Sequence, residues 1–153
     1  MILGSMVEII IFLIQFMKIV LVFSLMNFVD FEKLLKTCQK LKVLSISMIN
    51  KDEKNKFKSN EEKLSKALIE FASKNLRIIK FSRYDFKFSL KTLEFLLENW
   101  RGRAALSILT SALDYEKEEY MKIINKYKND GVIKDFKCII NSDDYLFDHE
   151  MMI

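Results

Sequence analysis

The sequence predicts an α/β protein, built as a short and irregular solenoid in which helices alternate with parallel strands. Hydrophobic residues make up 50% of the chain and charged residues 30%, a balance typical of a protein with a core rather than of a disordered or linker protein. Short apolar segments recur after segments of helical periodicity, at separations of 35, 27 and 30 residues between their centres Leu44, Ile79, Leu106 and Phe136. This spacing indicates a strand-plus-helix repeat, in which each unit buries its apolar face only by stacking on a neighbour.

Residues 1–28 form an apolar segment with two interpretations. Between Ile9 and Met26 the only charged residue is Lys18. In the first interpretation the segment is a partial repeat, with a buried helix over 6–17 and a buried strand over 19–24 whose centre is Val22. In the second, residues 9–26 are a single membrane-spanning helix, because 18 residues approach the about 20 that such a helix needs. The segment lacks the positive start and the cleavage site of a secretory signal.

Residues 29–138 hold the predicted repeat domain. After Asp30, a plausible N-cap, apolar residues recur at helical spacing and lead into a strand over 41–46. Ser59 and Glu62 are spaced as a capping box for the next helix, which leads into a strand over 76–81. The sequence thus predicts two successive helix-strand units.

The third unit has the clearest boundaries. Ser89 precedes the helix as an N-cap, and Gly102 follows it as the residue that ends it. The strand after it covers 106–108. The predicted buried stripe of this helix consists of Leu90, Leu93, Leu96, Leu97 and Trp100.

The fourth unit is a helix over 115–129 that stops at Gly131 and leads into a strand over 133–138. Residues 139–153 contain no Lys or Arg, and we expect them to be a flexible acidic tail. The acidic residues of this tail are Asp143, Asp144, Asp148 and Glu150.

The composition argues against an enzyme. The chain has 3 Gly, no Pro and a single His, His149, which leaves little material for phosphate loops, His metal sites or a Ser-His-Asp triad. Cys38 and Cys138 are predicted to be free, buried thiols in a reducing compartment. We therefore expect no catalytic residues, no metal and no cofactor, and a cytoplasmic location.

Nucleic acid is not an expected partner. Arg101 and Arg103 flank the aromatic Trp100 and could stack on a base, but Trp100 also belongs to the buried helix stripe. The arginines have a second explanation too, because cations complement the carboxyl end of a helix. Lysines over 51–58 are interrupted by acidic residues, which is typical of a solvated loop.

Four segments within Asp30–Cys138 resemble a known family. They are FEKLLKTCQKLKVL (31–44), ALIEFASKNLR (67–77), FSLKTLEFLLENWRGR (88–103) and NKYKNDGVIKDF (125–136). They look like the C-terminal, leucine-rich-repeat-like region of the expanded F-box proteins of arbuscular mycorrhizal fungi. The resemblance implies a leucine-rich-repeat-like solenoid that recognises a protein, as the repeats of such ubiquitin-ligase receptors hold their targets.

The same resemblance implies a limit on partners. The F-box, which recruits the ubiquitin-ligase adaptor, has no counterpart here, because no Leu-Pro opening can exist in a chain without proline. Adaptor binding is therefore not expected.

A protein-binding face follows from the alternation of side chains along each strand. Residues that alternate with the buried positions should face outward and contact a protein partner. They are Val43, Ser45, Ser47, Ile78, Lys80, Ser82, Ser107, Asp135 and Lys137. The alternative function is a small membrane-anchored protein, in which residues 9–26 tether a cytosolic repeat domain.

Overall fold

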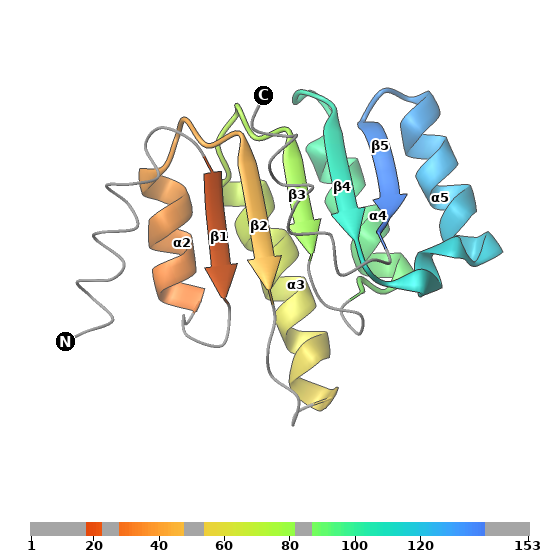
Figure 1. Ribbon diagram of the computed structural model, residues 1–153, viewed down its shortest axis with the longest axis horizontal. Helices are drawn as coiled ribbons and strands as arrows, with labels where there is room; N and C mark the ends of the chain where they lie inside the picture. The colour runs from red at the N-terminus through yellow and green to blue at the C-terminus, as the bar shows by residue number, and fades with distance from the viewer. Residues whose placement is uncertain (1–17, 23–27, 48–53, 82–86, 140–153) are drawn as a thin grey trace.

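The structure is a computed structural model that describes residues 18–22, 28–47, 54–81 and 87–139. Strands and helices alternate along the described chain (Figure 1). In order, the elements are β1 (Lys18–Val22), α2 (Phe28–Thr37), β2 (Val43–Ser47), α3 (Lys54–Phe71), β3 (Ile78–Phe81), α4 (Leu90–Trp100), β4 (Leu106–Thr110), the 3-10 helix η2 (Leu113–Glu116), α5 (Glu118–Asn129) and β5 (Ile133–Cys138).

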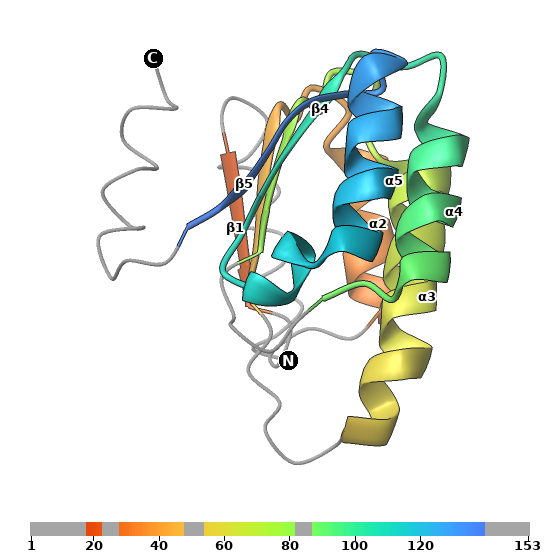
Figure 2. The same cartoon turned by 90° about the vertical axis from the view of Figure 1, so that its right-hand side faces the viewer.

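The described elements form two layers. One layer is a five-stranded sheet in which the strands follow chain order, β1-β2-β3-β4-β5, and each pairs in parallel with the next. The other layer consists of α2, α3, α4 and α5, which all lie on the same face of the sheet (Figure 2). The prediction of an α/β fold with helices alternating with parallel strands is confirmed, and the sheet is open, with β1 and β5 at its edges.

The register aligns equivalent positions of the strands in one row. Leu44 pairs with Ile19 on one side and with Ile79 on the other, and the row continues through Ile108 to Phe136. Leu44, Ile79 and Ile108 are almost fully buried in the core between sheet and helices. Two predicted strand centres are therefore wrong: Ile19, not Val22, is equivalent to Leu44, and Ile108 replaces Leu106.

Local chemistry explains why α4 begins and ends where it was predicted to. The Ser89 hydroxyl accepts a hydrogen bond from the Thr92 amide at 3.3 Å, which satisfies a donor of the first turn. Gly102 has φ +87°, a left-handed conformation that residues with a side chain rarely adopt. Gly131 (φ +78°) ends α5 in the same way.

Three predicted helix starts are wrong. The helix α3 begins at Lys54, so Ser59 lies inside it and not at the N-cap position that a capping box with Glu62 requires. The helix α2 begins at Phe28, which places Asp30 in its first turn, where a carboxylate favours the helix dipole. The predicted helix over 115–129 is divided, because η2 ends at Glu116 before α5 begins at Glu118.

The apolar N-terminal segment is described only in part. Its residues 18–22 form β1, at the place where the repeat interpretation predicts a strand. Residues 1–17 and 23–27, and with them the predicted helix over 6–17, lie outside the described residues, as do residues 140–153 of the predicted acidic tail. No helix among the described residues is both long enough and apolar enough to cross a membrane.

Candidate functional site

The sheet register places the predicted binding residues in two rows across the face that carries no helices. The first row is Val43, Ile78, Ser107 and Asp135. The second row is Ser45, Lys80, Leu109 and Lys137. From β2 to β5 the described members of the predicted set thus lie on one face of the sheet. Sequence reasoning missed Leu109, although it stands two residues after Ser107 and alternation would have found it.

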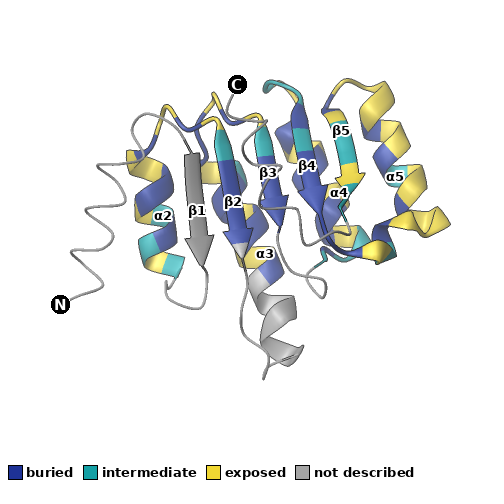
Figure 3. Ribbon diagram, in the orientation of Figure 1, coloured by how far each residue is buried: buried dark blue, intermediate teal, exposed yellow. Residues whose placement is uncertain are grey.

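Burial divides the two rows. All residues of the first row are half-buried, whereas Ser45 and Lys80 are only 3% exposed and Leu109 only 1%. Lys137 is exposed, and β5 is the least buried strand from β2 onward (Figure 3). The expectation that Ser45 and Lys80 are open to a partner is thus wrong, because alternation fixes the direction of a side chain from a strand but not what covers it. Ser82 and the side chain of Ser47 lie outside the described residues.

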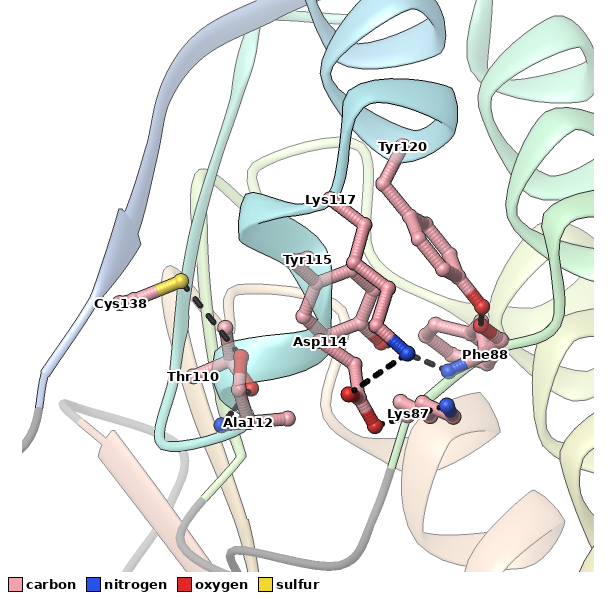
Figure 4. Close-up of polar contacts among 9 residues, drawn as sticks. All are labelled: Lys87, Phe88, Thr110, Ala112, Asp114, Tyr115, Lys117, Tyr120 and Cys138. Carbon is pink, nitrogen blue, oxygen red and sulfur yellow. Dashed lines mark hydrogen bonds and ion pairs between the residues drawn. The ribbon is translucent and has the colours of Figure 1, made fainter.

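A polar network occupies the carboxyl ends of β3 and β4 (Figure 4). The amide of Phe88 donates to the Tyr115 hydroxyl at 2.6 Å, and the Tyr120 hydroxyl donates to the Phe88 carbonyl at 2.7 Å. Two phenols thus hold both backbone groups of one residue, immediately before α4. The rings of Tyr115 and Tyr120 also contact each other edge to face, with centroids 5.1 Å apart.

The charged members of this network neutralise one another. Lys87 binds Asp114 at 2.7 Å, and Lys117 binds the other oxygen of the same carboxylate at 3.3 Å. The hydrogen bond from Lys87 lowers the pKa of Asp114 and raises the pKa of Lys87. Burial raises the pKa of both Tyr115 and Tyr120, so the phenols stay neutral. These groups hold the backbone around Phe88 in place.

A carboxylate anchors the start of α4 in the same region. Glu61, which is 8% exposed, accepts hydrogen bonds from the Ser89 amide at 3.0 Å and from the Ser89 hydroxyl at 2.7 Å. A nearly buried carboxylate needs such donors, because desolvation penalises its charge. Glu61 therefore ties α3 to the N-terminus of α4.

A cavity of about 520 Å³ lies at the other end of the strands, beside their amino ends. It lies where α2, α3 and α4 end and the chain turns toward β2, β3 and β4. Three of its lining residues are cations and one is a carboxylate. The lining consists of Lys36, Gln39, Glu70, Phe71, Ala72, Lys74, Gly102, Arg103 and Ala104.

Sequence reasoning did not predict this cavity. The available pattern was a basic residue near the end of each of three helices, Lys36, Lys74 and Arg103. The same pattern complements helix dipoles in many proteins, so it does not indicate a cavity by itself. Trp100 is 1% exposed and its indole donates to the Ala104 carbonyl at 3.2 Å, so its ring belongs to the core.

Both cysteines are free thiols, as predicted. Cys38 is buried, whereas Cys138 is half-buried and its thiol donates to the Ala112 carbonyl at 3.5 Å. Burial raises the pKa of both thiols, which lowers their reactivity. Within the described part of the chain, no three His, Cys, Asp or Glu side chains come together as a metal site would require.

Comparison with known proteins adds no family: neither a protein-family model nor a curated protein sequence matches the chain.

Proposed function

We propose that this chain is a protein-interaction module, in which an irregular, leucine-rich-repeat-like solenoid binds a protein through its strand face. The observation that supports this proposal most is the strand order. Parallel strands that follow chain order, with all helices on one face, leave one continuous face of side chains from successive units. Binding across several units is how such repeats recognise proteins.

The accessible part of this face is the first row together with Lys137. Val43 and Ile78 offer apolar contacts, Ser107 a hydrogen-bonding hydroxyl and Asp135 a carboxylate, all of them half-buried. A partner segment that lies across the strands would meet an apolar half on β2 and β3 and a polar half on β4 and β5. Ser45 and Lys80 are buried and are not part of the proposed contact.

A role in choosing targets for ubiquitin ligation rests on the family resemblance alone. The resemblance proposes that the repeats hold a target protein, and it proposes no adaptor contact for residues 29–138. Protein binding and ubiquitin ligation are therefore separate questions, and the first can be tested without the second.

Site-specific photo-crosslinking in the cell tests protein binding. A photoreactive amino acid is introduced at Ser107 on the strand face, and as a matched control at Lys122, an exposed residue of α5 in the helix layer. We expect one protein to be captured from position 107 and not from position 122. The captured protein, once purified, should lose at least tenfold in affinity with Asp135→Arg and less than twofold with Lys122→Glu.

Two results would contradict the proposal. One is capture of the same proteins from both positions, which indicates random collision. The other is that no protein is captured from position 107 or from Ile78, its neighbour in the row.

A further inference from the structure

The cavity at the amino ends of the strands is lined by cations that form no ion pair within the described residues. Lys36, Lys74 and Arg103 line it together with one carboxylate, Glu70. Within the described residues none of these three cations forms an ion pair. Two residues before Arg103, Arg101 shows the contrast: its guanidinium binds Glu98 at 2.9 Å and Asp130 at 2.7 Å.

Arg103 is held in place by its neighbours, but not all of its hydrogen-bond donors have a partner within the described residues. One terminal nitrogen, Nη2, donates to the Ile69 carbonyl, and the guanidinium carbon lies 4.5 Å from the centroid of the Trp100 ring. The other, Nη1, is buried and has no hydrogen-bond partner within the described residues. Burial lowers the pKa of Arg103, because desolvation penalises the charged guanidinium. An anion in the cavity would supply the missing charge.

The carboxyl ends of the helices repel an anion, whereas the lining cations attract one. The two charges must therefore be compared. Three helices, α2, α3 and α4, end beside the cavity. Each carboxyl end carries a partial charge of about −0.5, which gives about −1.5 for the three together. The lining side chains, three cations and one carboxylate, carry a formal charge of +2. The exposed Lys40, Lys42 and Arg77 in the neighbouring loops add to the positive side. The balance at the cavity is therefore positive.

A neutral side chain already caps two of these helices. The amide nitrogen of Gln39 donates to the carbonyls of Leu35 at 2.8 Å, Lys36 at 3.1 Å and Phe71 at 3.4 Å. The ends of α2 and α3 thus do not need Lys36 or Lys74 as hydrogen-bond donors. These two lysines remain available to a ligand, with the Lys36 ammonium placed 4.3 Å from the centroid of the Phe71 ring.

We propose that this cavity is a binding site for a small molecule that carries a phosphate group. Arg103 supplies a positive charge that its contacts with Ile69 and Trp100 hold at the cavity. The two ammonium groups add charge and donors without demanding a fixed geometry, as phosphate recognition by lysine requires. The volume of about 520 Å³ lies in the range of sites for small molecules. The proposal is independent of the strand face, because its lining residues belong to the loops and helix ends.

Calorimetric titration of the full chain at low ionic strength tests the site, with pyrophosphate as the probe and citrate as a polyanion without phosphorus. We expect saturable binding of pyrophosphate and at least tenfold weaker binding of citrate. Lys74→Gln should weaken pyrophosphate binding at least fivefold. Lys66→Gln removes an equal charge from the exposed face of α3, outside the cavity, and should change it less than twofold.

A second pair of variants separates a built site from a diffuse basic surface. Arg103→Gln should reduce pyrophosphate binding at least tenfold, whereas Lys42→Gln, an exposed residue outside the cavity lining, should cost less than threefold. Because Arg103 packs on Trp100 and its variant could destabilise the fold, Lys74→Gln, whose side chain makes no hydrogen bond or ion pair within the described residues, is the decisive variant. The proposal is overturned by absence of saturable binding, by citrate binding as tight as pyrophosphate binding, or by equal losses from Lys42→Gln and Lys74→Gln.

Discussion

The two ends of the sheet use charge in opposite ways. At the carboxyl ends, Asp114 is neutralised by two lysines and the phenols of Tyr115 and Tyr120 hold the backbone of Phe88. At the amino ends, the three cations around the cavity form no ion pair within the described residues, either with the lining carboxylate Glu70 or with another side chain. Polar groups that only stabilise a fold are normally satisfied within it. The difference therefore assigns stability to the carboxyl end and binding to the amino end.

The largest expected effect comes from Tyr115 at the carboxyl end. Its side chain is 2% exposed, and its ring contacts both Tyr120 and Phe136. Tyr115→Ala should lower the free energy of unfolding by about 3–5 kcal/mol, because it leaves a cavity and removes the hydroxyl that accepts a hydrogen bond from the Phe88 amide. At the amino end, Lys74→Ala should change it by less than about 0.5 kcal/mol. Urea unfolding measures both, and similar losses at the two ends would refute the division.

A smaller effect should separate the capping group at the amino end from the cations beside it. Gln39→Ala removes donors from the carbonyls at the ends of α2 and α3 and should cost about 1 kcal/mol. Lys40→Ala, at the exposed neighbouring position, should cost less than about 0.5 kcal/mol. The same urea experiment applies. If Lys40 proved the more important of the two, the cations rather than the amide would cap the helices.

Low pH should reduce the stability that Asp114 contributes at the carboxyl ends of the strands. Because Lys87 and then Lys117 lower the pKa of Asp114 in the folded protein, the carboxylate stabilises the fold above its ordinary pKa of 3.8. This contribution is lost as the pH falls from there through the lower pKa of the folded state. The difference in free energy of unfolding between the wild type and Asp114→Asn should be constant at higher pH and shrink in that acidic range. A difference that does not depend on pH would show that the ion pairs do not act on stability.

The smallest effect concerns the two thiols, one near each end. Cys38, at 2% exposure after α2, should react with a thiol reagent more slowly than the half-buried Cys138 at the end of β5. Both should react faster after denaturation, because burial raises the pKa of each thiol in the fold. Equal, rapid labelling of the native protein would contradict the described burial.

Periodicity made most of this fold predictable. The stripe of α4 and its flanking Ser89 and Gly102 lie in one continuous segment, so local rules located the helix. The start of α3 was not predictable in this way, because residues 54–58 are polar except for Phe57 and form no apolar stripe. Tertiary context and helix propagation decide such a segment rather than its own pattern.

The candidate sites also differ in how far local sequence patterns could predict them. Alternation along the strands placed Ile78 and Ser107 on one face, because side-chain direction is a local property of a strand. It could not predict that Lys80 is buried, since burial depends on what surrounds a central strand. The cavity joins residues from three turns that are far apart in the sequence, so no local pattern could reveal it.

The most direct test of the division between the two ends is an assigned amide NMR spectrum of the full chain during titration with pyrophosphate. We predict that shifted signals belong to the turns at the amino ends, residues 36–42, 70–77 and 101–105, and that Phe88 and residues 110–120 stay unchanged. Largest shifts at Phe88 and in residues 110–120, or shifts of equal size at both ends, would contradict the account.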